Sequence, residues 1–497
     1  MSVGVAGLQR IVLRAAVGMM LGVAFATGVV APGAAAAQGI PATEYAARRD
    51  SLAARLGSAV VVAFGAPAAT SEAPRGQLPA FRYLTGFLEP DAALVLVVRG
   101  GHGSGTLYRV ARDPRRALYD GFLPDSTAIA RTTGLLARTI ADLRPALDSL
   151  ARSGLPFYTL RDFGGADYAD TDSLTRGVSF LRAFAAGHAG LELRDAHPVL
   201  DSLRARKSPA EIALLRRAID ITVAGHRELL RTIRPGMREY EVEALLASTF
   251  RRTGGDGPAF SSIVGSGPNS TQYHYAANAR RMEAGDVVVV DVGAGYQGYA
   301  ADVTRTLPVS GSFTPEQRAV YQIVRDAQAA AERVVRPGAS TRAWTDSARA
   351  VVARGIARLG LIESVDATFD PPWADQCPRQ PVRCTQAFLY MAHGLGHGIG
   401  LEVHDPPAIA YRSAQFQEGE VFTIEPGVYV SRRLLDILPD TPKNRAMIAH
   451  VRGAVERYHD IGVRIEDDYA VTASGVEWLS RVPREPDEIE AAMRRGR

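Results

Sequence analysis

Apolar residues in the first part of the chain alternate between short runs and helical spacings. The short runs predict buried β-strands over 58–64, 92–98, 106–110 and 157–160. The helical spacings predict helices over 128–152 and 174–185. Strands and helices that alternate in this way indicate a mixed α/β domain, which we place at residues 38–200.

The second part of the chain begins with a helix whose start is clearly marked. Ser208-Pro209-Ala210-Glu211 has the residues of a capping box, with proline at the first helical position. The amphipathic stretch that follows stops at Arg234-Pro235-Gly236, and the same tripeptide recurs as Arg336-Pro337-Gly338 after a helical stretch over 316–335. The repeat indicates an internal duplication, or it reflects a common way of ending a helix.

A strand, a glycine-rich turn and a second strand follow at residues 286–306. The β-branched run Val287–Val290 leads to Asp291, and alternation resumes over 299–306, which contains Asp302. A hairpin would place the two carboxylates on neighbouring strands. Because buried carboxylates repel each other and are costly to desolvate, divalent cations between them would remove both problems.

Three further metal donors lie downstream. His397 lies in a glycine-rich stretch, Glu425 ends an apolar strand, and Glu466 lies in an alternating strand. With Asp291 and Asp302 they make four carboxylates and one imidazole, whose charge balances two divalent cations. Oxygen-rich ligation favours a hard ion, so we expect two divalent metal ions, most simply Mn²⁺.

Four segments around these donors resemble the motifs of the pita-bread metallopeptidases. They are Gly298–Pro308 (GYAADVTRTLP), Ala392–Asp405 (AHGLGHGIGLEVHD), Thr423–Tyr429 (TIEPGVY) and Gly462–Asp468 (GVRIEDD). The order of the five donors also matches, and the likeness is nearest to the Xaa-Pro aminopeptidase (aminopeptidase P) family. Residues 81–97 and 207–243 are similar to the same enzymes, so the resemblance covers nearly all of the chain after the expected signal peptide at residues 1–37.

The resemblance implies two domains. Residues 38–200 would form an N-terminal creatinase-like α/β domain, and residues 201–497 a C-terminal pita-bread catalytic domain. The pita-bread domain has pseudo-two-fold halves, each with helices packed on an antiparallel sheet, around a dinuclear metal site. The N-terminal domain would shape the mouth of its own active site or of a neighbouring subunit's, and we expect a homo-oligomer, a dimer or a tetramer.

The resemblance also implies a role for each metal ligand. In this family a hydroxide that bridges the two metals is the nucleophile. Asp291 would be the bidentate ligand of one metal, Asp302 and Glu466 would bridge the two, and His397 and Glu425 would complete the shells. Glu425 is also the best candidate for the proton shuttle, because it would lie beside the hydroxide.

Four more residues complete the expected catalytic set. By resemblance, His404 donates to the oxyanion, His393 contacts the substrate near the scissile bond, and His274 lies on the opposite wall. Arg464 precedes Glu466 by two residues in an alternating strand, where it could orient the carboxylates through a bidentate pair. The alternatives are a buried, hydrogen-bonded core histidine in each case and a surface charge for Arg464.

The leading functional hypothesis is an exported aminopeptidase that hydrolyses the N-terminal Xaa-Pro bond of peptides. A prolidase, which cleaves only Xaa-Pro dipeptides, uses the same five ligands and is the nearest alternative. A non-catalytic peptide-binding module on the same fold is an alternative of another class, although such proteins typically lose ligands and all five are present here. Proline specificity rests on the resemblance, because the sequence does not show the pocket.

The composition of the chain limits the classes of molecule that it is expected to bind. The net charge is +4, and Lys207 and Lys443 are the only lysines, so the basicity comes from arginine. The arginines are scattered, with no basic stripe interleaved with aromatic residues. We therefore expect no nucleic acid and take a peptide with an N-terminal Xaa-Pro as the partner.

The only cysteines, Cys377 and Cys384, lie close together in a proline-rich loop. In an exported protein this arrangement favours a local disulfide. Two free, exposed thiols are the alternative.

Residues 1–37 have the pattern of a signal peptide. Arg10 and Arg14 form a positive region before an apolar run over 15–30, and an alanine-rich cleavage pattern ends before Gln38. We therefore expect a periplasmic or secreted protein with no stable membrane span after cleavage. An uncleaved anchor helix is the alternative, although the apolar run is short for a span.

Two insertions interrupt a minimal version of this fold. Residues 366–386 precede the expected ligand His397, and residues 431–461 lie between Glu425 and Glu466. Long loops beside a site often act as rims or lids, and surface decoration is the alternative.

Overall fold

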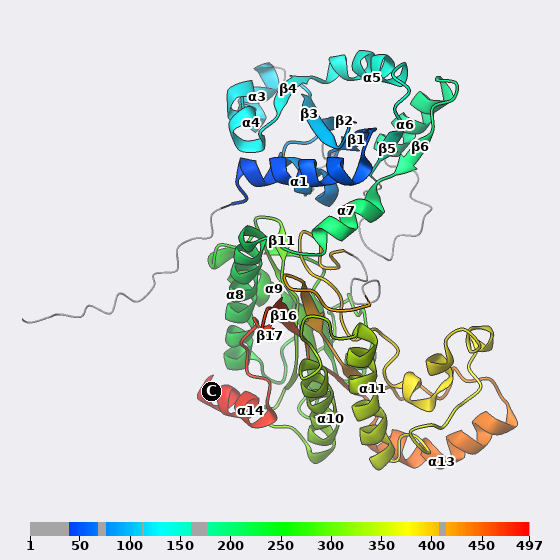
Figure 1. Cartoon of the computed structure of the whole chain (residues 1–497). Coiled ribbons are helices and arrows are strands. Elements are labelled where there is room, and N and C mark those ends of the chain that lie inside the picture. The colour runs from blue at the N-terminus through cyan, green and yellow to red at the C-terminus, as the bar shows by residue number, and fades with distance from the viewer. Residues whose placement is uncertain (1–38, 68–75, 112–113, 161–175, 407–413, 497) are drawn as a thin grey trace, which may run out of the picture. The chain divides into compact units, whose positions relative to one another are not determined.

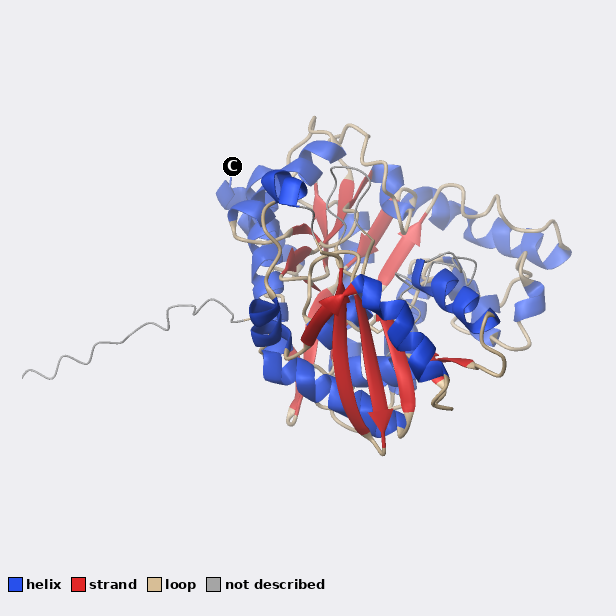
Figure 2. Ribbon diagram, turned by 90° about the horizontal axis from the view of Figure 1, so that it is seen from above, coloured by secondary structure: helices blue, strands red, loops and turns tan. Residues whose placement is uncertain are grey.

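The computed structural model describes residues 39–67, 76–111, 114–160, 176–406 and 414–496. The leader expected over 1–37 lies outside these ranges, so it stays a prediction. Residues from Ala37 onward form one structural unit, and Figure 2 shows helices lying against the strands of its sheets. The α/β fold class expected from the sequence is confirmed.

A six-stranded sheet organises the N-terminal region. Its strands are β1 (Ala59–Phe64), β2 (Ala93–Arg99), β3 (His102–Arg109), β4 (Leu136–Thr139), β5 (Phe157–Thr159) and β6 (Leu193–Asp195). They lie in the order β4-β3-β2-β1-β5-β6. Strands β1, β2 and β3 pair antiparallel, and β4, β5 and β6 each join a neighbour in parallel. The four strands predicted from apolar runs correspond to β1, β2, β3 and β5.

Helices cover both faces of this sheet. Val61 of β1 packs in a core with residues of α1 (Ala42–Leu56), α2 (Pro79–Thr85), α4 (Ser126–Thr133) and α7 (His197–Arg204). Val60 faces the opposite core, with residues of α5 (Leu143–Ala151) and α6 (Arg176–Ala186). A further helix, α3, spans Pro114–Asp120. Because both faces are buried, β1 and β2 read as continuous apolar runs rather than alternating ones.

The single helix predicted over 128–152 is wrong. The structure has α4, then β4, then a short 3₁₀ turn (Ile140–Asp142) and α5. Asp125 caps α4 by accepting a hydrogen bond from the backbone N–H of Ala128, and Gly134 ends it with a φ of 67°. A glycine in this left-handed conformation stops a helix, and β4 then pairs with β3, an interaction that local spacing does not reveal.

Two helix pairs frame the C-terminal region. They are α8 (Pro209–Thr232) with α9 (Glu239–Arg252), and α10 (Pro315–Glu332) with α11 (Thr341–Arg358), the last two lying side by side (Figure 1). The predicted capping box at Ser208 is present. Gly236 and Gly338, the glycines of the repeated tripeptide, have φ values of 93° and 81° and connect the helices of each pair. Each copy of the tripeptide therefore forms the turn between the two helices of its pair.

Each helix pair is followed by a three-stranded antiparallel sheet. The first contains β8 (Ile263–Ser266), β9 (Val287–Val292) and β12 (Val303–Pro308), and the second β13 (Val421–Ile424), β16 (Asp467–Thr472) and β17 (Gly475–Trp478). Backbone hydrogen bonds in both directions between Thr304 and Glu466, of 3.1 and 3.3 Å, join the two halves. This repetition is the pseudo-two-fold arrangement expected of a pita-bread domain.

The remaining elements are short. They are β7 (Gly257–Pro258), β10 (Ala294–Tyr296), β11 (Tyr299–Ala300), β14 (Gly427–Val430), β15 (Ile461–Arg464), the 3₁₀ turns at Gly267–Thr271, Ala374–Gln376, Pro381–Cys384 and Gln386–Leu389, and the C-terminal α14 (Pro486–Gly496). Among the described helices, none has the length and apolar character needed to cross a bilayer.

The two insertions pack against each other. Helix α13 (Pro442–Tyr458) forms most of the second insertion, and its N-cap residue Thr441 donates a 2.7 Å hydrogen bond to Asp370 of the first. Asn444 donates to the backbone carbonyl of Asp370 at 2.8 Å. Within the first insertion, Cys377 and Cys384 form a disulfide, as predicted. Whether the pair of insertions acts as a rim or lid stays a prediction.

The disulfide should stabilise the protein by restricting the unfolded chain. Replacing both cysteines (Cys377→Ser with Cys384→Ser) should lower the free energy of unfolding by roughly 2–3 kcal/mol, the loop-entropy value for so short a closure. Chemical denaturation with and without reductant measures it. Reductant should destabilise the wild-type protein and leave the double variant unchanged; an equal response of both proteins would contradict the prediction.

Candidate metal centre

The first two candidate ligands come from one β-hairpin. Asp291 is the fifth residue of β9, a strand that is buried throughout, and Asp302 immediately precedes β12. The two strands pair antiparallel with Thr304 opposite Asp291. The predicted placement of both carboxylates on neighbouring strands is therefore close to what the structure shows, with Asp302 one residue before its strand begins.

The other three candidate ligands come from the second half. Glu425 directly follows β13, and Glu466 lies between β15 and β16. His397 lies in the loop that follows residues 386–389, and its backbone N–H donates to the hydroxyl of Thr423 on β13 at 3.1 Å. The acids thus project from strand ends, where the ladder stops and side chains of different strands can converge.

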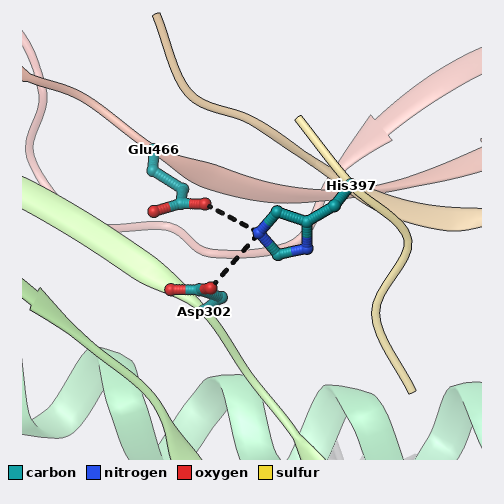
Figure 3. Close-up of side chains that lie close together, drawn as sticks. All are labelled: Asp302, His397 and Glu466. Atoms are coloured by element: carbon teal, nitrogen blue, oxygen red, sulfur yellow. Dashed lines mark ion pairs between the residues drawn. The ribbon is translucent and has the colours of Figure 1, made fainter. Parts of the chain in front are cut away.

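Three carboxylates surround Nε2 of His397. It lies 3.5 Å from Oδ2 of Asp302, 3.7 Å from Oε1 of Glu425 and 3.7 Å from Oε1 of Glu466. Figure 3 shows His397, Asp302 and Glu466 converging; one donor atom from each of these three lies within 4.8 Å of the others. A single point is therefore within reach of an imidazole nitrogen and several carboxylate oxygens.

The hydrogen bonding of His397 leaves a lone pair facing these carboxylates. Its Nδ1 lies 3.1 Å from the carbonyl oxygen of Gly398, and this contact places the proton on Nδ1. Burial, and then the neighbouring His404, lowers the pKa of His397 to about 3, so the ring is neutral at neutral pH. This lone pair repels any of the facing carboxylates that is ionised. A bound cation would be attracted by the lone pair and by the ionised carboxylates alike.

The carboxylates also have unused acceptor atoms. One oxygen of Asp291 and one of Asp302, Oδ1 in each, are buried and accept no hydrogen bond from any described residue. Burial, and then the charge of Glu466, raises the pKa of Asp302 and of Glu425 well above the ordinary value. Burial, and then Asp291, raises the pKa of Glu466 to about 8. Buried acids with free lone pairs beside a neutral imidazole fit a site for hard divalent cations.

Asp291 differs from the other acids because Arg464 contacts it. Burial opposes ionisation of Asp291, but Arg464 outweighs burial and lowers the pKa of this carboxyl. The guanidinium is 5% exposed, so the surface-charge alternative for Arg464 is wrong. The bidentate pair expected for it is also wrong: one nitrogen donates to Asp291 and the other to the hydroxyl of Tyr429 at 2.9 Å.

Tyr429 extends this contact to His393. Its hydroxyl lies 3.0 Å from Nε2 of His393, and because it accepts from Arg464 it can donate to the histidine. Nδ1 of His393 lies 2.7 Å from the carbonyl of Gly394. Burial, and then Arg464, lowers the pKa of His393 to about 3, which keeps the ring neutral. Arg464, Tyr429 and His393 thus form one chain of contacts beside Glu425, whose Oε2 is 3.6 Å from His393.

The structure brings the two remaining histidines to the site in different ways. The ring of His404 lies 4.1 Å from that of His397, centroid to centroid. His274 is exposed, and it lies close enough to His393 to contribute to the lowered pKa of that ring. All nine residues that the sequence proposed therefore lie in one region, and each histidine except His274 is at least half-buried.

Several residues of this region were not identified from the sequence. Thr304 donates a 2.7 Å hydrogen bond to Oε2 of Glu466, Thr423 supports His397, and Tyr429 links Arg464 to His393. Tyr273 packs edge to face against His393 and Tyr429. Thr304 could have been found, because it lies two residues after Asp302 on the same face of an alternating strand. Tyr429 ends one of the motifs and Tyr273 directly precedes His274, but no pattern in the sequence assigns either of them a role.

Comparison with known proteins agrees with this fold and donor set. The description "Metallopeptidase family M24" matches residues 213–473, and "Aminopeptidase P, N-terminal domain" matches residues 45–155. The chain belongs to metallopeptidase family M24. It is a peptidase, a hydrolase of the Xaa-Pro aminopeptidase group within that family.

Similar proteins of known activity match this chain over about two thirds or more of their length. The Xaa-Pro aminopeptidase of Escherichia coli (strain K12) is 33% identical over 461 residues, which cover 90% of this chain and 97% of the relative. The Xaa-Pro dipeptidase of Homo sapiens is 33% identical over 350 residues, 65% of this chain and 66% of the relative. A structure described as zinc-substituted E. coli aminopeptidase P in complex with product has a TM-score of 0.74 at 32% identity, and the match covers 93% of this chain and all of that one.

The family implies divalent metal ions, and the donor set described above fits them. The expectation of Mn²⁺ stays a prediction, because a zinc-substituted relative exists. The expected dimer or tetramer also stays a prediction.

Because the acids are crowded, we expect substitution of one of them to stabilise the metal-free protein and to weaken the stabilisation by metal. Burial and Glu466 raise the pKa of Asp302, so at neutral pH metal-free wild type must take up a proton there on folding; Asp302→Asn removes this cost, and the metal-free variant should be more stable than metal-free wild type. Adding Mn²⁺ should raise the melting temperature of wild type and change the variant much less.

Differential scanning calorimetry of chelator-treated protein measures both effects. Asp436→Asn, which changes an exposed acid, is the matched control and should respond to metal as wild type does. A less stable metal-free Asp302→Asn variant that still responds fully to Mn²⁺ would show that Asp302 is no ligand.

Proposed function

We propose that this protein is an exported aminopeptidase that removes the first residue of peptides whose second residue is proline, using two divalent metal ions, by preference Mn²⁺. The observation that carries the proposal is the neutral His397 with its Nε2 lone pair among three buried acids, which cannot all ionise at neutral pH unless cations are present. The similarity to Xaa-Pro aminopeptidases over nearly the whole chain supports the substrate class.

The ligands would be divided between the two halves of the domain: Asp291 and Asp302 from the first, His397, Glu425 and Glu466 from the second. When bound, the ions would supply Lewis acidity and lower the pKa of a water in the site. Glu425 lies between His397 and His393, at 3.7 and 3.6 Å, so its carboxylate can carry a proton from the ligand side of the site to the substrate side.

Neutral imidazoles suit the stabilisation of an oxyanion. Hydrolysis of an amide develops negative charge on the carbonyl oxygen, and a neutral N–H can donate to it without neutralising the carboxylates nearby. His404, whose ring lies beside that of His397, is the proposed donor. Arg464 and Tyr429 would hold Asp291 and His393 in place for this step.

An aromatic cluster supports proline as the second residue of the substrate. The nitrogen of an Xaa-Pro bond bears no hydrogen, so recognition requires a surface for the ring rather than a backbone acceptor. Tyr273, His393 and Tyr429 pack edge to face with centroids 4.5–5.4 Å apart, and His393 adjoins Glu425. We assign the proline ring to this cluster.

Peptide hydrolysis tests the proposal directly. With Mn²⁺, the protein should release the first residue of Xaa-Pro-Xaa tripeptides and cleave Xaa-Ala-Xaa far more slowly. Glu425→Gln should lower kcat by roughly 10²–10⁴-fold, because it removes both a ligand and a proton carrier. Glu418→Gln, at an exposed glutamate, is the matched control and should keep full activity.

The outcome also separates the alternatives. Cleavage of Xaa-Pro dipeptides alone would make the protein a dipeptidase. Binding of peptides without any hydrolysis, whichever metal is added, would overturn the enzymatic proposal.

We also propose export, on the pattern of residues 1–37. Expressed with its leader in a Gram-negative bacterium, the chain should accumulate in the periplasmic fraction with a mature N-terminus at or close to Gln38, as read by N-terminal sequencing. Deleting residues 1–37 should retain the protein in the cytoplasm. Recovery of an intact leader in the membrane fraction would favour an uncleaved anchor instead.

A further inference from the structure

A buried ion pair lies behind the turn that joins His397 to His404. Arg204, the last residue of α7, is 2% exposed and donates from Nη2 to Oε2 of Glu402 at 2.6 Å. The same nitrogen lies 3.0 Å from Oδ2 of Asp405. Lys207 donates from Nζ to the backbone carbonyl of Asp405 at 2.8 Å. Two buried cations therefore converge on one residue of this turn.

Asp405 closes the turn. Its Oδ2 accepts from the backbone N–H of Leu401 and, at 3.3 Å, from that of Glu402, while its own N–H donates to the carbonyl of Gly398 at 2.7 Å. Its Oδ1 is buried and has no hydrogen bond from any described residue. The orientation of this carboxylate therefore depends on the partners of Oδ2, and within the described part of the chain Arg204 supplies the one side chain among them.

The turn carries a site residue at each end. His397 precedes Gly398, and His404 precedes Asp405, with the two rings 4.1 Å apart. A change at Asp405 would move His404 directly and would reach His397 through the bond between Asp405 and Gly398. The burial of Asp405 would raise its pKa, but Arg204 and then Lys207 outweigh burial and lower it, so the carboxylate stays charged.

The cation that holds this turn comes from the N-terminal region. Helix α7 crosses the domain boundary expected at residue 200, and its residue Leu200 and its N-cap residue Ala196 are buried in the core of the six-stranded sheet. Leu401, from the turn, packs against the same core. The N-terminal region therefore contacts the turn twice, through an ion pair and through an apolar side chain.

We propose that Arg204 is a positioning residue for the peptidase site: through Asp405 it fixes the turn 398–405 and so sets the positions of His404 and His397. The proposal rests on the proposed function, because it assigns importance to the placement of His404. It gives the N-terminal region an indirect part in catalysis, through the turn, in addition to the expected shaping of the site's mouth.

A double-mutant cycle with His404 distinguishes positioning from general stability. Arg204→Gln should lower kcat by roughly 10–100-fold, since small displacements of a reacting group have effects of this size, and change KM by no more than about threefold. In a His404→Ala background the same substitution should lower kcat by a clearly smaller factor, because one of the two residues that it positions is absent. Arg206→Gln, at an exposed arginine two residues away, is the control.

Hydrogen–deuterium exchange followed by mass spectrometry gives a readout that does not depend on activity. In Arg204→Gln the amides of Leu401, Glu402 and Asp405 should exchange faster, and those of the six-stranded sheet should not. If Arg204→Gln does not fold, Arg204→Lys keeps the charge without the guanidinium fork and should show the same changes at smaller size.

The results separate the two proposals. Unchanged exchange in the turn, or losses in kcat that add in full in the His404→Ala background, would overturn the positioning role while leaving the peptidase assignment intact. Absence of peptide hydrolysis by the wild-type enzyme would overturn the proposed function and leave the exchange result to be judged by itself.

Discussion

A neutral imidazole faces buried carboxylates in this protein, and the C-terminal region is arranged to hold them there. Together they place a lone pair against acids whose ionisation is opposed by burial and by one another. Such an arrangement persists only if the surrounding fold fixes it, and here every acid projects from the end of a buried strand. The fold supplies the energy of assembly, and cations would then stabilise the result.

A second set of contacts orients the expected metal ligands by occupying one polar atom of each. Arg464 donates a hydrogen bond to one oxygen of Asp291, and Thr304 donates one to an oxygen of Glu466. The backbone carbonyl of Gly398 accepts one from Nδ1 of His397. In each case the contact occupies one atom of the ligand and leaves another facing the centre. Surrounding groups that orient ligands in this way are typical of metal sites and determine which atom of each side chain remains available.

Much of the site could be predicted from the sequence because its residues lie in strong local patterns. Asp291 follows a run of valines, Glu425 ends a strand, and the five donors occur in a known order. The contacts of Arg464 could not be predicted, since its division between Asp291 and Tyr429 depends on the pairing of β14 with β15. The predicted helix over 128–152 was wrong for a similar reason: β4 exists because β3 is beside it.

The N-terminal region illustrates the same limit. Apolar runs predicted its main strands, yet nothing in the sequence of α7 indicated that Arg204 reaches the turn behind His404. Arg204 and Asp405 are 201 positions apart, and an ion pair over that separation has no local pattern. Packing of the six-stranded sheet against the catalytic region creates it.

The hydrogen bonds between Thr304 and Glu466 have a consequence for how the chain matures. Neither half carries a complete donor set, and Glu466, the last of the expected ligands, is synthesised after the other four. A chain that is still being synthesised, or that has not yet folded, therefore has no assembled metal site. The capacity for hydrolysis arises only when both halves have folded against each other.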